Sequence, residues 1–431
     1  MGAAVGSGVD GAAVLRAGAG VGLGDGLGEG AALGAVSGWA CSCGAGSAPA
    51  GESAMPSIPP CPTRPFSAAL PTVALCVGAF FCNFLARIGL APYLPGLEAE
   101  FGITHAAAGG LFLPMSAAFS LTLVLSGFAA KRLGHRRTIA LSSAGLGVCL
   151  LVAAASPGFG LRRLALAGLG AAAGLYFPSG IALITASLHP GHWGKGLAMH
   201  ELAPNLSYIL APALAAAGGG AWSWRAVLAG LGLFTLAVAL AAARFPGPDP
   251  APGESPRPAV LREVLAHPAF WVLTALFSLV VGASFGPFAM LPLYLHEVRG
   301  LPLAETGTLL AGSRLAGPFL VLAAGLLVDR VGAGRVAAAS LAFTGAMTLG
   351  VGLADGWLLK AAVLLQPALS VLFFPAGFTA AARIFPERVR NVAISLIVPV
   401  AVLVGSGLTP LLLGWAGDRG RFGLGFALLG L

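Results

Sequence analysis

The sequence is poor in charge. Aspartate, glutamate, lysine and arginine together make up 9% of its 431 residues, whereas a soluble globular protein carries about 25%. This shortage excludes a surface that is covered mainly by water, and 57% of the residues are hydrophobic. We therefore expect an all-α integral membrane protein whose outer surface faces lipid. A chain of this length can form about a dozen spans of roughly 20 residues each.

Motifs for catalysis, nucleotide binding and metal binding are also missing. The six cysteines match no zinc spacing and no disulfide framework, and we interpret them as incidental. No loop of the G-x-x-x-x-G-K-[ST] type is present, so ATP-driven transport by this chain is not supported. We expect no enzymatic activity, no cofactor and no metal. The net charge of +8 indicates loop Lys and Arg residues near an anionic leaflet, not a nucleic-acid partner.

The first part of the chain differs from the rest. Residues 1–66 are rich in glycine and alanine and then in proline, and glycine at this density cannot maintain a helix. They lack the basic start and continuous apolar run of a secretory signal. We interpret them as a disordered extension, or as the result of a start codon assigned too early.

Long apolar runs separated by short charged or Gly/Pro-rich loops follow. Each run is long enough to cross about 30 Å of hydrocarbon at 1.5 Å per residue. A Pro-rich stretch at 245–258 interrupts the series and is followed by a predicted short helix at 259–266. The predicted spans are 68–95, 105–130, 136–155, 161–188, 195–219, 224–243, 268–295, 303–328, 335–354, 357–383 and 391–416.

The two halves of this series resemble each other at an offset of 196 to 198 residues. The segment GFAAKRLG at 127–134 corresponds to GLLVDRVG at 325–332, and three pairs of positions around prolines follow the same offset. Parallel repeats of six spans are a transporter design in which the binding site lies between the halves. We predict an N-terminal six-helix bundle at 67–243, a cytoplasmic linker at 244–266 and a C-terminal bundle at 267–431.

The same offset predicts an incomplete last helix. The partner of the sixth span should end near residue 440, but only ten residues follow Arg421, which is about 15 Å of helix. We therefore expect a truncated twelfth helix. The loops that follow the even-numbered spans carry thirteen Lys and Arg residues against seven on the opposite side. This bias predicts a multi-pass protein of the inner (plasma) membrane with a cytoplasmic N-terminus.

Two related loops carry a motif that is typical of a known family. The second copy has Gly325, Asp329, Arg330, Gly332 and Arg335. The first copy has Gly127, Arg132 and Gly134, but Lys131 stands where the family has an aspartate. With the patterns around Trp224-Arg225 and Gly414…Asp418-Arg419, the chain resembles the major facilitator superfamily over about residues 67–431. The resemblance implies two six-helix bundles related by pseudo-two-fold symmetry.

The charges of these loops suggest a gate. An aspartate at a helix end beside arginines can form charge-assisted hydrogen bonds that close one face of the protein. In the second copy Asp329 with Arg330 or Arg335 can do so, whereas Lys131 removes the carboxylate from the first copy. The alternative is that these residues only set the orientation in the membrane.

Ionisable residues within the predicted spans are candidates for function. Glu201 lies beside His200 and shares a helix face with Asn205 and, one turn further, Tyr208. A carboxylate in a low-dielectric cavity can exchange a proton near neutral pH, so we propose Glu201 and His200 for proton coupling. The alternative is that Glu201 forms a permanent structural pair with a buried arginine.

Arginines in two other spans suggest an anionic substrate. Arg314 lies midway along the eighth span, and Arg87 lies in the first span near Asn83. Guanidinium groups bind carboxylate or phosphate through forked hydrogen bonds. Organophosphate and nitrate transporters of the superfamily use paired arginines, but the symmetric positions here are Pro287 and Ser116, so neither substrate carries over. The alternative for both is snorkelling of the side chain toward the membrane interface.

We expect a monomeric secondary transporter with a small-molecule substrate, in which protons drive the uptake of an organic anion. Asn83, Arg87, Asn205, Tyr208 and Arg314 are the predicted substrate-binding residues. The alternatives are an efflux antiporter for drugs or metabolites, and a transporter-like receptor or scaffold.

Overall fold

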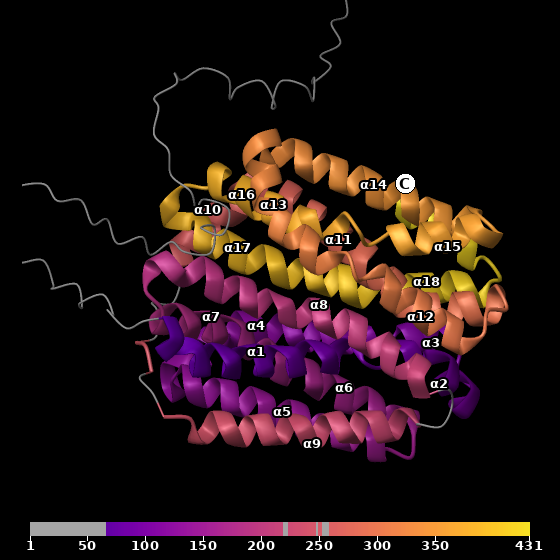
Figure 1. The fold of residues 1–431 in the computed structure, drawn as a ribbon, viewed down its shortest axis with the longest axis horizontal. Helices are drawn as coiled ribbons and strands as arrows, with labels where there is room; N and C mark the ends of the chain where they lie inside the picture. The colour runs from indigo at the N-terminus through magenta and orange to yellow at the C-terminus, as the bar shows by residue number, and fades with distance from the viewer. Residues whose placement is uncertain (1–65, 219–222, 247–248, 252–257) are drawn as a thin grey trace, which may run out of the picture. The chain divides into compact units, whose positions relative to one another are not determined.

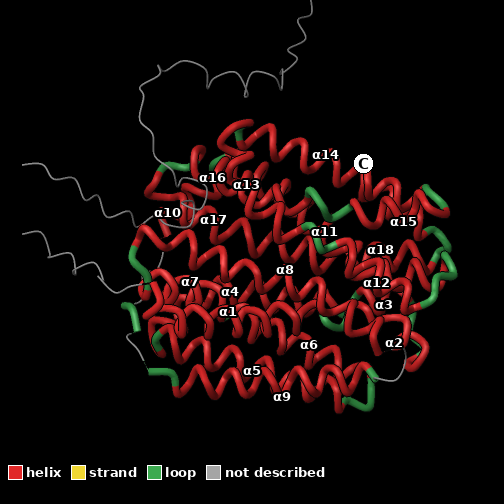
Figure 2. Tube along the Cα trace, viewed as in Figure 1, coloured by secondary structure: helices red, strands yellow, loops and turns green. Residues whose placement is uncertain are grey.

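The computed structural model describes residues 66–218, 223–246, 249–251 and 258–431. The predicted extension, except Phe66, lies outside the described residues. All regular elements of the described part are helical (Figures 1 and 2). This confirms the predicted all-α fold, whereas the exact domain boundaries that the repeat suggested remain predictions.

The described part of the first half contains nine α-helices, α1 to α9. A short 3₁₀ turn, η3, joins α1 to α2, and another, η4, precedes α8. The elements are α1 (Phe66–Ile88), η3 (Ala91–Tyr93), α2 (Leu94–Phe101), α3 (His105–Gly109), α4 (Phe112–Leu133), α5 (His135–Ala155), α6 (Phe159–Gly174), α7 (Tyr176–Ser187), η4 (Pro190–His192), α8 (Trp193–Gly218) and α9 (Trp224–Arg244).

The second half repeats this arrangement after a short connecting helix, α10. Its last helix, α19, is nine residues long, about 14 Å, and packs against α14 and α18. The elements are α10 (Pro258–Ala266), α11 (Pro268–Leu293), η5 (Tyr294–Val298), α12 (Leu303–Ser313), α13 (Gly317–Val331), α14 (Ala333–Leu353), α15 (Gly356–Leu365), α16 (Ser370–Ile384), α17 (Glu387–Val402), η6 (Leu403–Leu408), α18 (Thr409–Asp418) and α19 (Phe422–Gly430).

Nine helical segments of the described chain are long and apolar enough to cross a membrane. They are Phe66–Phe101, His105–Leu133, His135–Ala155, Phe159–Ser187, Trp224–Arg244, Pro268–Val298, Ala333–Leu353, Gly356–Ile384 and Arg388–Asp418. The predicted spans 195–219 and 303–328 are not among them. They correspond to α8 and to the α12–α13 pair, which contact each other across the interface between the halves.

Several predicted spans are interrupted near proline. Proline has no N–H group, and its ring clashes with the preceding turn, so it breaks the hydrogen-bond ladder of a helix. The eighth span breaks into α12 and α13 just before Pro318, and the tenth breaks at Pro367 between α15 and α16. A π-helical segment, η6, begins four residues after Pro399. The sequence predicts Arg314 midway along a continuous helix, but it lies at the break between α12 and α13.

Polar ties repeat between the halves. The Asn83 side chain of α1 donates to the Ala173 carbonyl of α6, with 2.9 Å between nitrogen and oxygen. In the second half Gln366, just after α15, donates to the Ala283 carbonyl of α11 at 2.6 Å. In each half the bond joins the first predicted span to the fourth. Both side chains are buried, so these bonds link helices inside each half.

Glycines bring backbones together inside the first half. A Cβ atom on Gly170 of α6 would lie 1.9 Å from the Met115 carbonyl oxygen of α4, whereas a Cβ on Gly160 of the same helix would meet nothing within 4 Å. The α4–α6 contact therefore requires a glycine at the first position and not at the second.

The two halves meet most closely at one end, which we call the His105 end; the opposite end is the Lys131 end. At the His105 end α3 packs on α18 and α8 packs on α12 (Figure 1). A Cβ atom on Gly109 would lie 2.3 Å from the Pro410 carbonyl oxygen, and one on Gly414 would lie 2.2 Å from the His105 carbonyl oxygen. Main chain thus meets main chain across the seam, and this end is closed.

Candidate functional site

An aromatic and cationic cluster lies where the halves meet. The Tyr208 ring of α8 is at its centre, with the Phe84 ring of α1 at 5.2 Å and the Phe288 ring of α11 at 4.8 Å between centroids. The Arg314 guanidinium lies 4.2 Å from the Tyr208 centroid and 5.3 Å from that of Phe288. Side chains from both halves therefore share one cluster.

Arg314 is held by the helix break that the proline causes. It is the C-terminal cap of α12, and the next helix starts three residues later at Gly317. Its side chain is 8% exposed and donates to the Ser284 carbonyl at 2.9 Å, while its Nε has no acceptor. Among the described residues it has no carboxylate partner within salt-bridge distance. A buried guanidinium without a counter-ion can accept an anionic ligand.

Arg87 reaches the same cluster from the first half. It lies in the last turn of α1, with its guanidinium 4.1 Å from the Phe119 centroid and 5.4 Å from the Phe84 centroid. The Phe84 ring in turn contacts the Tyr208 ring, on which Arg314 lies. The part of the chain that the structure describes offers Arg87 no ion pair either. The structure thus brings together two arginines that are 227 positions apart in the sequence.

The two predicted asparagines lie differently. The Asn83 amide is 2% exposed and donates to the Ala173 carbonyl, so it already acts as a helix tie. Asn205 donates to the Glu201 carbonyl of its own helix at 2.9 Å. Its side-chain oxygen points at Gly317 of α13, 2.8 Å from where a Cβ atom would be. Asn205 therefore lies on the interface between the halves, whereas Asn83 lies inside the first half.

Glu201 faces a histidine, not an arginine. Its Oε1 lies 3.6 Å from Nδ1 of His200, and its side chain is 45% exposed, whereas His200 is fully buried. The Tyr176 hydroxyl lies 2.6 Å from the Cys76 carbonyl and 3.1 Å from His200 Nε2. Because a carbonyl can only accept, the tyrosine proton points at Cys76, and His200 Nε2–H donates to the tyrosine oxygen. The alternative prediction of a buried arginine partner finds no support among the described contacts.

This arrangement leaves one nitrogen for a proton. In the neutral histidine Nδ1 carries a lone pair, and it has no hydrogen-bond partner. The Phe80 ring stacks on the imidazole at 4.1 Å and fixes its plane. A proton that enters from the exposed Glu201 carboxylate can therefore be received at His200 Nδ1. The sequence analysis did not single out Tyr176 or Phe80. Both are visible as aromatic residues within apolar runs, but nothing in the sequence links them to His200.

The gating loops lie at the Lys131 end. Gly134 and Gly332 have φ angles of +82° and +95°, which favour glycine, and each follows the last turn of its helix, α4 or α13. Lys131, Arg132, Asp329, Arg330 and Arg335 are exposed. No ion pair of the described chain involves them. The predicted charge gate is therefore not formed in this conformation. Gly127 and Gly325 lie within α4 and α13, about two turns before the loops.

A carboxylate that the sequence analysis missed lies at the first of these loops. Asp249, from the segment between the halves, accepts hydrogen bonds from the backbone nitrogens of His135 at 3.1 Å and Arg136 at 3.3 Å. A Cβ atom on Gly134 would lie 2.2 Å from its Oδ2. The loop that lacks the family's aspartate at Lys131 thus has a carboxylate from elsewhere in the chain, which no local motif could reveal.

One groove is unsuited to a polar solute. It has a volume of about 530 Å³ and is lined by α1, α8 and α9 through side chains such as Phe81, Leu214 and Phe234. Because its lining is almost entirely apolar, it fits a lipid chain better than an ion. The cluster around Tyr208 remains the candidate substrate site.

Solved structures of transporters share this fold. A bacterial homologue of the human lysosomal transporter Spinster, inward-facing and unoccupied, has a TM-score of 0.71 and 16% sequence identity, with 83% of this chain and 84% of that chain covered. The nucleoside transporter NupG has a TM-score of 0.69 and 13% identity, with 83% and 96% covered. These identities establish similarity of fold alone.

Sequence comparison is decisive for the family. No curated protein matches the sequence significantly. The family model of the Major Facilitator Superfamily matches residues 76–323, which is more than half of the chain. The nine segments of the described chain that are long and apolar enough to cross a membrane agree with it, as does the fold that the chain shares with solved transporters. The chain therefore belongs to the Major Facilitator Superfamily, a family of membrane transporters that move solutes.

Proposed function

We propose that this transporter moves a small organic anion together with protons by alternating access. The observation that carries the proposal is that Arg87 and Arg314, from opposite halves, lie on two rings that contact each other, Phe84 and Tyr208, without a carboxylate to neutralise them. An anion bound between them would supply the missing negative charge.

The physics of the cluster favours an anion over a neutral solute. Guanidinium groups stay protonated in proteins and offer several donors in a planar fork that matches carboxylate or phosphate. In a low-dielectric environment, unpaired charges are costly, so an anion that pairs with both gains more there than in water. The aromatic rings of Phe84, Tyr208 and Phe288 would pack against an apolar part of the same substrate.

His200 and Glu201 supply the proposed proton site. The exposed Glu201 carboxylate lies 3.6 Å from the buried imidazole of His200. Glu201 is four residues, about one helical turn, before Asn205, which lies at the interface between the halves. A proton bound between the two would neutralise Glu201 and so reduce repulsion of an incoming anion. Substrate and proton would then favour each other, which is the requirement for symport.

The closed His105 end fits one state of the transport cycle. Two structural neighbours, Spinster homologues, are described as inward-facing. By analogy we assign the Lys131 end to the cytoplasm, in agreement with the Lys and Arg bias of the loops, and place the protein in the plasma membrane with a cytoplasmic N-terminus. A charge gate at the Lys131 end would then form only when that end closes.

Proteoliposomes test the proposal. Purified protein is first screened by thermal shift against monocarboxylates, dicarboxylates and phosphate esters, because a ligand of the folded state raises its melting temperature. The best ligand is then followed as a radiolabelled solute while a proton gradient is imposed. We expect accumulation that a proton ionophore abolishes. Absence of any anion effect on stability and transport would contradict the proposal.

The coupling residue has a separate test. We expect Glu201→Gln to lose accumulation driven by the proton gradient while it retains exchange of labelled for unlabelled substrate at equal pH. Glu263→Gln is the matched control, since Glu263 is an exposed carboxylate paired with Arg388 outside the site. If Glu201→Gln accumulates substrate as the wild type does, Glu201 is not the coupling residue.

A further inference from the structure

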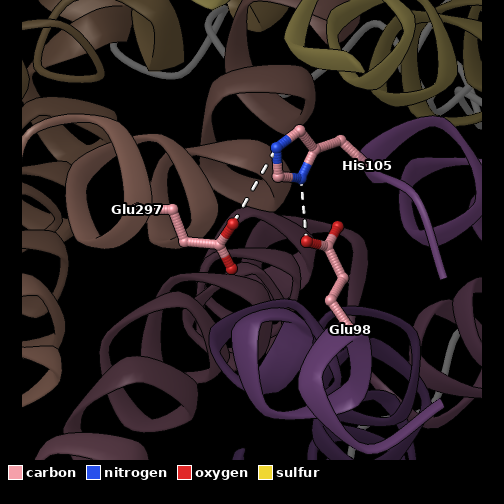
Figure 3. Close-up of side chains that lie close together, drawn as sticks. All are labelled: Glu98, His105 and Glu297. Carbon is pink, nitrogen blue, oxygen red and sulfur yellow. Dashed lines mark hydrogen bonds and ion pairs between the residues drawn. The ribbon is translucent and has the colours of Figure 1, made fainter. Parts of the chain in front are cut away.

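A second cluster of titratable groups lies on the seam at the His105 end (Figure 3). Nδ1 of His105 lies 2.8 Å from Oε2 of Glu98, and its Nε2 lies 3.8 Å from Oε2 of Glu297. The imidazole is thus held between two carboxylates, one at each ring nitrogen. These side chains line a pocket of about 530 Å³ together with Asp418.

The members of the cluster come from different halves. Glu98 lies in α2 and His105 begins α3, both in the first half, whereas Glu297 lies in η5 and Asp418 ends α18, both in the second. Asp418 accepts hydrogen bonds from the backbone nitrogens of His105 at 2.7 Å and Ala106 at 3.2 Å. The cluster therefore forms completely only while this end is closed.

The charges of the closed cluster are unbalanced. Two carboxylates contact the ring nitrogens of one imidazole, and a third, from Asp418, binds the main chain of the same residue. The Phe422 ring of α19 lies 5.2 Å from the imidazole. The nearby arginines contact other groups: Arg299 contacts Asp355 and Tyr294, and Arg419 stacks on Trp415. Among the described residues His105 is the cation within salt-bridge distance of Glu98 and Glu297.

With both glutamates ionised, the contacts of the ring favour a proton on each nitrogen. A carboxylate can only accept, so the 2.8 Å contact with Glu98 needs Nδ1–H. In a neutral imidazole Nε2 would then carry a lone pair toward the Glu297 carboxylate, which is repulsive. In the imidazolium Nε2–H faces Glu297 instead, and both contacts become attractive.

We propose that His105, between Glu98 and Glu297, is a proton-binding site that holds the His105 end closed. The site depends on neither the substrate nor the coupling residue proposed above. The imidazole is 20% exposed and Glu297 is 36% exposed, so the proton exchanges with solvent on this side. Glu98 belongs to the same half as His105 and stays near it when this end opens. Glu297 and Asp418 belong to the other half, so opening moves their carboxylates away from His105.

The sign of the pH effect follows from this difference. The closed form has more negative charge around His105 than the open form, so it binds the proton more tightly. Proton binding and closing therefore favour each other, and lower pH favours the closed form. For one linked proton the closed-to-open ratio changes by at most about tenfold per pH unit. At high pH the carboxylates repel one another, and the end opens.

Distances across the two ends test the proposal. Spin labels are placed at exposed positions on opposite halves, Ala99 and Ala304 for the His105 end and Arg137 and Arg335 for the Lys131 end. We expect acidification from pH 8 to pH 5 to increase the short-distance population of the first pair and decrease that of the second. A distance distribution that does not change with pH overturns the proposal.

Variants separate the proton from other causes. His105→Gln keeps one hydrogen bond but cannot carry the charge, so we expect a distribution that is flat with pH. Glu297→Gln should raise the closed population at pH 8 and weaken the pH dependence, because a repulsive carboxylate is removed. Glu305→Gln is the matched control. Glu305 lies at the same end, but its Oε1 pairs with Nζ of Lys360 at 2.5 Å. Full pH dependence in His105→Gln contradicts the proposal.

A metal ion is the competing occupant, because Glu98, His105 and Glu297 each offer a ligand atom within 4.8 Å of the others. The distances are therefore measured with EDTA and, separately, with Zn²⁺. Unchanged pH dependence in EDTA supports the proton site, whereas closing that occurs only with Zn²⁺ overturns it. Glu201→Gln should leave these distances unaffected, so failure of the proposed coupling residue is distinguishable from failure of this site.

Discussion

Replacing Arg314 with glutamine tests whether its guanidinium binds the transported anion. The group is 8% exposed and stacked on Tyr208 at 4.2 Å, so bulk water solvates it poorly. A hydrogen bond to a charged group contributes roughly 1.5–3 kcal/mol. Two unit charges 4 Å apart gain about 4 kcal/mol at an effective dielectric constant near 20, before the desolvation of the anion is subtracted. We therefore expect a loss of about 2 kcal/mol, which corresponds to roughly 30-fold weaker binding.

The assay is a titration of purified protein with the organic anion that stabilises it most. Arg314→Lys should lie between wild type and Arg314→Gln, because it keeps the charge but loses the planar stack and the fork. Arg388→Gln is the control: Arg388 is 71% exposed and pairs with Glu263 on the surface, where such pairs contribute about 0–1 kcal/mol. Equal loss of affinity for the uncharged amide of the same ligand would refute the reasoning, since charge would not be the cause.

Two glycine pairs give further predictions. Gly170→Ala should lower the melting temperature markedly because its Cβ would meet a backbone carbonyl at 1.9 Å, whereas Gly160→Ala, with open space, should raise it slightly. Gly134→Ala should destabilise more than Gly332→Ala: both positions have positive φ, which costs roughly 1–2 kcal/mol, but only the first also meets a carboxylate. Thermal unfolding in detergent measures all four; equal effects within either pair would contradict the packing described.

Hydrophobicity predicted most of the fold. Lengths of apolar sequence are visible without any structure, and nine of the predicted spans correspond to membrane-length helical segments. The break at Arg314 was less accessible, because proline at 318 indicates a kink but does not say which residue will be left at the end of a helix. The sequence predicts that this charge lies within the eighth span, and the structure adds the ring on which it lies.

The side-chain networks could not be predicted because they join distant segments. The sequence suggests a role for His200 only through its neighbour Glu201. The orientation of the His200 ring depends on a hydrogen bond with Tyr176, which is 24 positions away. The contacts among Glu98, His105 and Glu297 cross between the halves, and Asp249 reaches its loop from the connecting segment. A repeat analysis compares equivalent positions, so contacts between non-equivalent positions escape it.

The seam at Gly109 and Gly414 has a consequence for energy conversion. A closed end that is sealed by side chains can open briefly, because an exposed side chain changes rotamer within picoseconds to nanoseconds. Main chain pressed against main chain has no such freedom, and it separates only when whole helices move. Water and ions therefore find no brief leak through this end between transport events. In the proton-coupled transport proposed above, such tightness would keep the gradient from being dissipated while no substrate is bound.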